Sequence, residues 1–454
     1  MNPPKPKARA DRVSLWQYAK LFRQDILSAQ PARLYRAWMA EFKTPFFRSY
    51  MVNQPDLIAT VLKNRPGDFP KSDRIGAGLR PLLGNSVFLT NGPVWERQRR
   101  IIDPAFEGGR LRETWGGMWA AAHAARDRLA AEAAQGPVEI EEIASFAAAD
   151  VIFRTLFSIP IEDRVAQEVF QEFRAYQRSQ PILNLAAFIP GPRWMPRFFR
   201  RDTRAAAARI RALITAMTEK RMAEIAAGTA PDDLATKIMT TPDPETGQTF
   251  TTQEMVDQVV IFFLAGHETS ASALGWALYL MALYPDWQDK IATEARALQS
   301  GDFSELSKLR ISRDVFRETL RLYPPVPMMV REATCPERFR DRDVPKGAQI
   351  VLSPWHLHRH ERLWDNPDGF DPTRWQTENG KRCAREAYMP FSAGARVCTG
   401  AGFAMAEGVL LLSLLLRDLK VSPIKGRVPI PEAHLTVRAR DGIWLDVTDR
   451  PPAT

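Results

Sequence analysis

Apolar residues recur every three to four positions along most of the chain, a spacing that predicts helices with one buried face. The pattern is sustained from about residue 92 to residue 230, where Ala, Leu, Glu and Arg dominate. The longest single helix is predicted over 257–284, because Pro285 cannot continue it. Further helices are predicted over 13–26 (amphipathic), 55–63, 311–322 and 402–417.

Short β-prone runs predict small sheets between these helices. The predicted strands cover 46–52, 328–331, 349–352, 435–438 and 443–447. Two apolar connections, 79–92 and 180–196, are punctuated by Gly or Pro and are predicted as loops that wall a binding site. Irregular turns are predicted from the end of the 349–352 strand to about residue 395. The expected fold class is mainly α with small β-sheets, in one integrated domain.

The 257–284 helix is apolar nearly all round from 259 to 265, which is typical of a buried core helix or of a membrane span. Glu268 lies in its middle, next to His267. A central glutamate costs about 2.5–3.5 kcal/mol in a bilayer, so we predict a core helix and no integral membrane span. The alternative is a membrane-associated protein built around this helix.

Charge and cysteine content narrow the class of protein. The chain has 454 residues with 62 Lys+Arg and 53 Asp+Glu, a formal net charge of +9. The basic residues are dispersed and no nucleic-acid-reading motif is present, so we expect an acidic protein partner and no nucleic acid. Three cysteines, Cys335, Cys383 and Cys398, are too few for a disulfide framework and favour a reducing compartment, the cytoplasm.

The most informative segment is FSAGARVCTG at 391–400. Its cysteine, Cys398, lies on a glycine-flanked loop before an apolar helix, where the helix N-terminus and Arg396 favour a thiolate. Such a thiolate is suited to be a metal ligand or a nucleophile, although a lone cysteine is more often structural. The whole string resembles the haem-ligand loop of the cytochrome P450 family. The resemblance implies that Cys398 binds haem iron, with Phe391 and Gly400 beside the cofactor.

A second match is Glu318-Thr319-Leu320-Arg321, an E-x-x-R pair on one helical face. In the family this pair locks with an arginine from a later segment, here Phe370-Asp371-Pro372-Thr373-Arg374. The resemblance assigns Glu318, Arg321 and Arg374 to a structural network that supports the haem loop.

A third match is Ala265-Gly266-His267-Glu268-Thr269, which resembles the family's oxygen-activation segment. We expect the Thr269 hydroxyl to bond to the Ala265 carbonyl, and Gly266 to leave a groove beside it. The resemblance assigns proton delivery to Glu268 and Thr269.

The haem propionates that the resemblance implies need cationic or hydrogen-bond-donating partners, for which four residues are candidates. Trp95 and Arg99 lie one helical turn apart and resemble the family's W-x-x-x-R. Arg331 and Arg396 are the other two, because arginine makes charge-assisted bonds to carboxylates.

Histidines alternate at His356, His358 and His360, which on a strand would share one face and suit zinc. No cysteine or carboxylate at metal spacing accompanies them. The family commonly has a His-Arg pair before a tryptophan, here His358-Arg359 and Trp364, so this structural interpretation is favoured over zinc.

The resemblance covers about residues 40–450. It implies a single triangular-prism-like domain over 36–454, with haem b between the long central helix and the cysteine-loop helix, and residues 1–35 as an extension without a membrane anchor. The implied activity is O2-dependent hydroxylation by a monomeric haem-thiolate monooxygenase. Electrons would come from a separate ferredoxin or flavodoxin with its NAD(P)H-dependent reductase. Docking of that partner is expected at Arg97, Arg100, Lys381 and Arg382.

The substrate is expected to be a hydrophobic small molecule, because the segments at the substrate positions are apolar. The expected wall residues are Leu83, Phe88, Phe262, Phe263, Ala265, Met328 and Met329. The alternative function is a haem-binding protein that keeps the fold without turnover.

Overall fold

The structure is a computed structural model that describes residues 2–43, 48–107, 109–179, 201–298 and 300–451. Its α-helices are α1 (Leu15–Gln24), α2 (Pro55–Ala59), α3 (Asp73–Leu83), α4 (Gly92–Ile102), α5 (Arg110–Ala133), α6 (Ile140–Phe157), α7 (Arg164–Ser179), α8 (Arg201–Ala226), α9 (Leu234–Thr240), α10 (Thr252–Leu283), α11 (Pro285–Arg296), α12 (Arg310–Leu322), α13 (Pro354–Leu357), α14 (Glu378–Glu386) and α15 (Ala401–Asp418).

The strands are short and fall into four small sheets. They are β1 (Met39–Lys43), β2 (Arg48–Val52), β3 (Val138–Glu139), β4 (Met329–Glu332), β5 (Glu337–Phe339), β6 (Arg342–Val344), β7 (Gln349–Leu352), β8 (Leu419–Pro423), β9 (Pro431–Ala433), β10 (Val437–Ala439) and β11 (Trp444–Asp449). The largest sheet has the order β1-β2-β7-β4, in which only the β2–β7 pair is parallel. The expected fold class, mainly α with small sheets, is confirmed.

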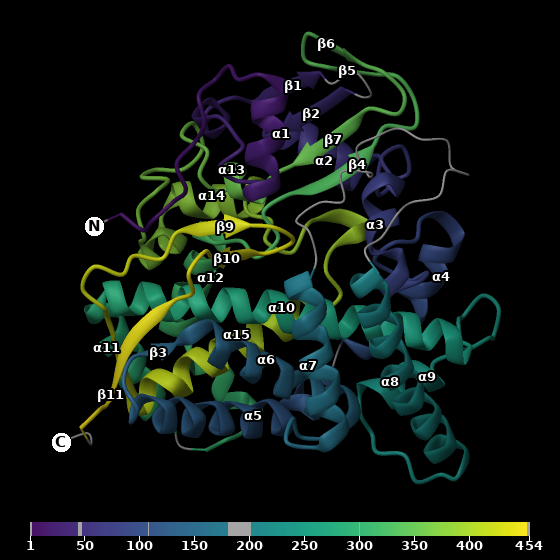
Figure 1. The fold of residues 1–454 in the computed structure, drawn as a ribbon, viewed down its shortest axis with the longest axis vertical. Coiled ribbons are helices and arrows are strands. Elements are labelled where there is room, and N and C mark those ends of the chain that lie inside the picture. Colours follow the sequence, from purple (N-terminus) through teal and green to yellow (C-terminus); the bar gives the residue numbers. More distant parts are fainter. Residues whose placement is uncertain (1, 44–47, 108, 180–200, 299, 452–454) are drawn as a thin grey trace.

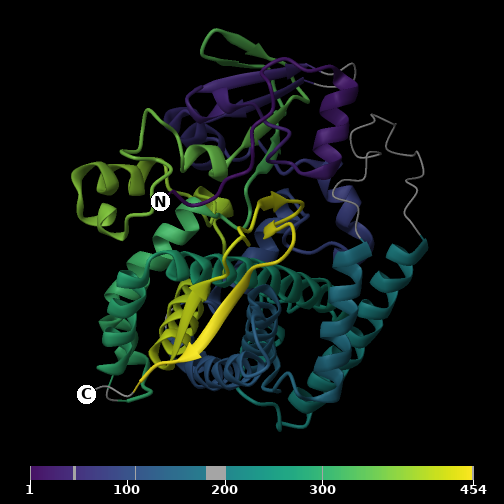
Figure 2. The same ribbon diagram turned by 60° about the vertical axis from the view of Figure 1, so that its left-hand side comes forward.

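Helix α10 is the axis of the molecule. It begins at a complete capping box, in which Thr251 and Glu254 bond to each other's backbone N–H groups. It ends before Pro285, as predicted. In Figures 1 and 2 it crosses the middle of the molecule, with the β1-β2-β7-β4 sheet on one side and α5, α6 and α15 on the other. Its apolar surface is therefore buried by protein, which explains why it is apolar nearly all round.

None of the helices in the described ranges has a stretch of low enough polarity and sufficient length to cross a bilayer. The central helix is a core helix in this structure, since its neighbours α6, α8 and α15 cover most of its surface.

A buried network of ion pairs joins α12 to the segment that precedes the cysteine loop. Glu318 and Arg321 on α12 are both fully buried and bond through both carboxylate oxygens, at 2.8 and 2.9 Å. Arg374 donates to the same carboxylate at 3.1 Å. The two arginines also donate to backbone carbonyls between residues 358 and 369, so every charge in this network has a partner. The structure thus brings together the three residues that the sequence grouped.

The structure differs from the sequence predictions where tertiary contacts outweigh local signals. The first five residues of the predicted 79–92 loop belong to α3, because Leu82 and Leu83 are buried and stabilise a helix that contains Gly76 and Pro81. Strand β1 and helix α14 were not predicted. The predicted 180–196 loop lies outside the described residues.

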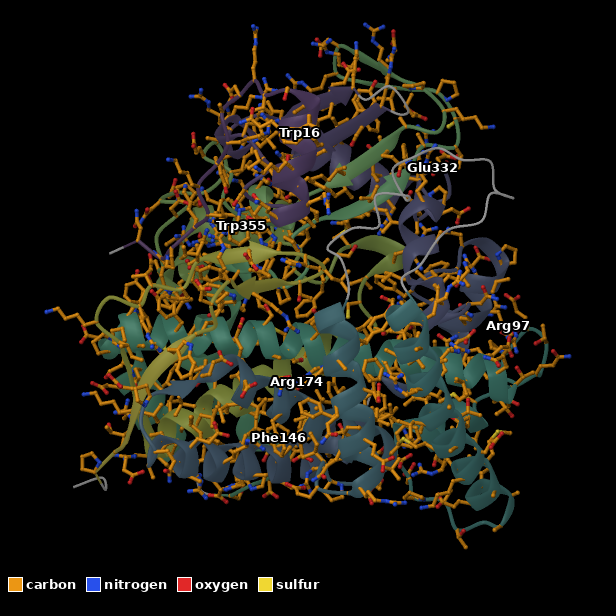
Figure 3. All side chains as sticks on the ribbon, in the orientation of Figure 1. Trp16, Arg97, Phe146, Arg174, Glu332 and Trp355 are labelled. Carbon is orange, nitrogen blue, oxygen red and sulfur yellow. The ribbon has the colours of Figure 1, made fainter. Side chains whose placement is uncertain are left out.

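The first 35 residues pack on the rest of the chain. The Asp25 carboxylate accepts a bond from the Ala433 backbone N–H at 2.8 Å, and the Tyr323 hydroxyl donates to the Pro4 carbonyl at 2.8 Å. Leu27 and Tyr35 belong to the same apolar core as α10. The amphipathic segment predicted at 13–26 forms α1, and its Trp16 is exposed (Figure 3).

We expect Arg321→Leu to lower the free energy of unfolding by about 3–5 kcal/mol, because it leaves the Glu318 carboxylate buried with one cation removed. Arg313→Leu on the same helix is the matched control, since this side chain is half exposed and pairs only with Asp314. The control should change stability by less than about 1 kcal/mol. Urea unfolding measures both, and equal midpoints for the two variants would contradict the network's role.

Candidate active site

The loop that carries Cys398 is closed on itself and packs against the helical turn Thr60–Asn64, which follows α2. The Cys398 backbone N–H donates to the Phe391 carbonyl at 2.9 Å. Gly394 has φ +69°, and a Cβ there would lie 1.9 Å from the Leu62 carbonyl oxygen, so only glycine fits. By contrast, a Cβ on Gly400 would meet no protein atom within 4 Å. The loop is therefore tight where it meets Leu62 and open beside Gly400, where a flat group has room.

The electrostatics of Cys398 differ from the prediction. Surrounding protein raises the pKa of this thiol, and the Gly400 N–H and the Arg99 guanidinium offset the increase only in part. The Gly400 N–H, at the N-terminus of α15, lowers the pKa of this thiol as predicted, but burial outweighs it in the absence of a bound metal. The side chain nevertheless remains exposed on one side. A metal cation bound there would ionise it, because coordinated thiols lose their proton.

One face of α10 is left uncovered in the middle of an otherwise buried helix. Ala265 is exposed, and Phe262, Gly266 and Thr269 on the same face are half-buried. The Thr269 hydroxyl donates to the Ala265 carbonyl at 2.6 Å, the bond that the sequence predicted. Gly266 also has a packing role, since a Cβ there would lie 2.5 Å from Ile152 of α6. This glycine allows α10 to pack closely on α6, and the expected groove beside it stays a prediction.

The Glu268 carboxylate is buried and turned toward β10. Its Oε1 accepts a bond from the Thr436 hydroxyl at 2.8 Å and lies 3.3 Å from the Arg438 guanidinium, while Oε2 has no hydrogen-bond partner among the described residues. Glu268 and Thr269, paired in the sequence prediction, thus have separate partners here.

Four cationic side chains gather around the sequence-predicted Trp95. Lys71, Arg99 and Arg396 lie 5.7, 5.8 and 4.9 Å from the centre of its ring, and Arg331 lies close enough to lower the pKa of Lys71. Arg99 pairs with Asp103 and donates to the Val397 carbonyl, beside Cys398. The structure thus brings the four predicted residues together and adds Lys71, which the sequence analysis missed.

Three of these cations, Lys71, Arg331 and Arg396, form no ion pair in the part of the chain that the structure describes. Burial and the neighbouring arginines lower the pKa of the Lys71 amine to about 6, and burial with Arg396 nearby lowers that of Arg331 to about 10. The Nε atoms of Arg331 and Arg396 are buried without a hydrogen-bond partner. Like charges held together and unsatisfied are costly, so this cluster fits a bound group that carries carboxylates. The residues present therefore fit a haem, with its propionates here and its iron at Cys398.

The expected substrate-wall residues divide into two groups. Phe262, Ala265, Met328 and Met329 are exposed or half-buried, and Phe88 is 48% exposed. Leu83 and Phe263 are instead buried in the helical core, where the Phe263 ring packs on Phe153 with centroids 4.5 Å apart. These two residues are therefore core residues in this structure.

The three alternating histidines are not on a strand. They lie on α13 and the turn after it, and each has its own contact: His356 with the Ser353 hydroxyl, His358 with the Met389 N–H, and His360 stacked on Trp38. The zinc alternative, which required one shared face, is wrong for this reason.

The four basic residues expected to dock a redox partner differ in their surroundings. Arg97 and Arg100 lie on α4 at the outer edge of the molecule, where Figure 3 labels Arg97. Both are paired within the chain, with Glu254 at 2.7 Å and Asp243 at 2.6 Å. Lys381 pairs with the exposed Glu378 at 2.9 Å. These ion pairs neutralise much of the positive charge that we expected to be available for docking a redox partner.

A further buried acid lies under the uncovered face of α10. Glu407 of α15 accepts a bond from the Ser270 hydroxyl at 2.7 Å, and burial raises its pKa to about 8. Neither Glu407 nor Lys71 stands out in the sequence, because a single charged residue in a helix or a loop has no periodic signal.

Comparisons with known proteins agree with this geometry. The family model described as "Cytochrome P450" matches residues 35–444. Cyclooctat-9-en-7-ol 5-monooxygenase of Streptomyces melanosporofaciens is 31% identical over 390 residues, 84% of this chain and 81% of the relative. Cytochrome P450 4A7 of Oryctolagus cuniculus is 29% identical over 86% of this chain and 79% of its own. The crystal structure of the cytochrome P450DA heme domain superposes with a TM-score of 0.81 at 24% identity, covering 99% and 98% of the two chains.

We expect Lys71 to make the stability of cofactor-free protein depend on pH. Its folded-state pKa of about 6 is far below that of an unfolded lysine, so the unfolded chain binds one more proton between about pH 6 and pH 10. The free energy of unfolding should rise with pH in that range, by up to about 1.4 kcal/mol per pH unit, and level off below pH 6. Urea titrations should show a flatter profile in Lys71→Met. The exposed Lys63→Met is the control, and a profile unchanged in Lys71→Met would contradict the assignment.

Proposed function

The chain belongs to the cytochrome P450 family, and we propose that it hydroxylates a C–H bond of a hydrophobic small molecule with electrons from a separate protein. As a member of this family, the protein is a haem b-dependent monooxygenase. The observation that supports the proposal most is the pairing of an accessible Cys398 with a cluster of buried cations that lacks an anion.

We assign the cofactor contacts as follows. Cys398 would bind the haem iron, and Lys71, Arg331 and Arg396 would hold the propionates, with Trp95 and Arg99 beside them. When bound, the haem iron supplies the activation of O2. Phe391 and Gly400 flank the ligand: the Phe391 carbonyl fixes the Cys398 backbone, and Gly400 leaves room for the ring.

Proton supply is the chemistry that this chain performs itself. Thr269 donates its hydroxyl proton to the Ala265 carbonyl, so its oxygen is held at one fixed point on the uncovered face of α10, where it can accept a hydrogen bond. Glu268, the preceding residue in the helix, is the acid that supplies protons to this point. A positioned group of this kind contributes about 10²–10⁴-fold to a rate.

The proposed substrate class is supported by the side chains near this face. Phe262, Ala265, Met328 and Met329 present carbon and sulfur, and methionine adapts to irregular apolar shapes. The relative from Streptomyces melanosporofaciens is named for oxidation of cyclooctat-9-en-7-ol, which is consistent with an apolar substrate.

The proposed electron donor is a ferredoxin or flavodoxin with its NAD(P)H-dependent reductase. The net charge of +9 favours encounter with an acidic electron-transfer protein. The exposed Arg382 is the better candidate for contact, because Arg97, Arg100 and Lys381 are paired within the chain. We also propose the cytoplasm as the compartment, which the three free cysteines support.

Turnover is tested by NADPH consumption with a surrogate ferredoxin system across hydrophobic compounds. With a substrate so found, Thr269→Ala should lower product per NADPH at least about tenfold and divert electrons to peroxide, because a positioned group at this point is lost. Thr155→Ala is the matched control, since its hydroxyl makes the same bond, to the Val151 carbonyl at 2.7 Å, in another helix.

Unchanged coupling in Thr269→Ala would contradict the role of this hydroxyl. Absence of any product across the compounds, with haem bound, would favour the alternative of a haem-binding protein without turnover.

A further inference from the structure

The loop that joins α3 to α4, residues 84–91, is held in place by side chains from outside it (Figure 1). It carries Phe88, an expected substrate-wall residue that is 48% exposed. Because a loop lacks the regular hydrogen bonds of a helix or a strand, the position of Phe88 depends on these contacts.

The first half of this loop is fixed to α10 and α4. The Asp257 carboxylate of α10 accepts a hydrogen bond from the Asn85 N–H at 2.7 Å. The Gln258 amide oxygen, on the same helix, accepts one from the Val87 N–H at 2.9 Å. The Gln98 amide of α4 donates to the Asn85 carbonyl at 2.7 Å. These contacts involve protein atoms alone, so they do not depend on a cofactor.

The second half of the loop is held by Lys71, which precedes α3. Its Nζ atom donates to the Val87 carbonyl at 2.5 Å and to the Thr90 carbonyl at 3.1 Å. Its backbone N–H and carbonyl make a reciprocal pair of hydrogen bonds with the Asn91 side-chain amide, at 3.0 and 3.1 Å. The two carbonyls that the Lys71 amine holds lie on either side of Phe88 in the chain.

Lys71 also belongs to the cluster of cations around Trp95. Its backbone forms an isolated bridge with that of Arg331, and its amine lies 5.7 Å from the centre of the Trp95 ring. Burial, and then the charges of Arg331, Arg396 and Arg99, lower the pKa of this amine to about 6. A neutral amine has two N–H donors, which match the two loop carbonyls, whereas an ammonium has a third. A carboxylate placed among these cations favours the ammonium and accepts its third bond.

We propose that Lys71 is a positioning residue that connects the cofactor to the substrate wall: its amine holds the Val87 and Thr90 carbonyls and, in the loaded protein, donates its third bond to a haem propionate. The propionate therefore restrains the loop around Phe88, and the shape of the substrate wall depends on it. The inference rests on the proposed function for the presence of haem at this site, and goes beyond it by naming what fixes Phe88.

The test compares two cofactors, because only one of them offers a carboxylate. The protein is loaded with haem or with haem dimethyl ester, whose propionates are esterified and carry no charge, and hydrogen–deuterium exchange is measured in peptides that cover residues 84–91. In the parent we expect exchange there to be about three- to tenfold faster with the ester, because a charge-assisted bond to Lys71 is lost. Equal exchange with the two cofactors would overturn the proposal.

Two variants assign the effect to Lys71. Lys71→Met removes the amine, so exchange in the loop should be fast and equal with the two cofactors. Lys71→Arg keeps the charge and the donors and should preserve the difference. A difference between the cofactors that persists in Lys71→Met means that the propionates act through another residue, and the proposal is then wrong.

Gln258→Met is the matched control, because it removes the bond to the Val87 N–H on the α10 side of the same loop. The Gln258 Nε2 atom has no hydrogen-bond partner among the described residues, so methionine leaves no acceptor of this group unpaired. Exchange should become faster with both cofactors, and the difference between them should remain as in the parent.

The vibrations of the propionates supply a second readout with haem alone. Resonance Raman spectroscopy detects the bending mode of haem propionates, whose frequency depends on their hydrogen bonds. Lys71→Met should shift this mode, and Gln258→Met should leave it as in the parent. An unchanged mode in Lys71→Met overturns the proposal even where exchange is altered.

The outcomes separate this inference from the proposed function. If the parent binds haem but makes no product, the proposed function fails, and the exchange and Raman comparisons still decide the role of Lys71. If Lys71→Met does not retain haem, the comparison of the two cofactors in the parent and in Gln258→Met decides it.

Discussion

The constraint on which the site depends is the burial of several cations without an anion. Lys71, Arg331 and Arg396 surround Trp95, and two of their Nε atoms have no hydrogen-bond partner in the described chain. Such a cluster opposes folding by itself, because like charges are brought into a poorly solvated place. The two propionates of a bound haem would reverse the sign of this interaction. In the proposed assignment, cofactor binding would therefore contribute to the stability of the fold.

Helix α10 has both a structural and a chemical role in the site. Most of α10 is buried against α6, α8 and α15, and this packing decides where its one uncovered face lies. Gly266 and Gly394 allow two close approaches, to Ile152 and to Leu62, which fix that face and the cysteine loop. The two neighbouring polar residues of α10 have different partners. Thr269 bonds within its own helix, whereas Glu268 bonds to Thr436, next to β10.

Much of this could be predicted from the sequence, for identifiable reasons. Helix α10 was predicted because its apolar run ends at Pro285, and the Glu318, Arg321 and Arg374 network because its residues lie in recognisable strings. The cysteine loop was found for the same reason. Lys71, Glu407 and Arg438 were not, since each acts through neighbours that are far away in the chain and leaves no local pattern. The roles of Gly266, Leu83 and Phe263 depend on packing, which periodicity does not resolve.

The central claim is that the Cys398 thiolate ligates haem iron in a monooxygenase of this family. The most direct test is the ferrous–CO difference spectrum of the purified haem protein, with Cys398→Ser beside it. A strongly red-shifted Soret band that the variant loses is the predicted result. A spectrum typical of histidine ligation, or a parent protein without haem, would contradict the claim.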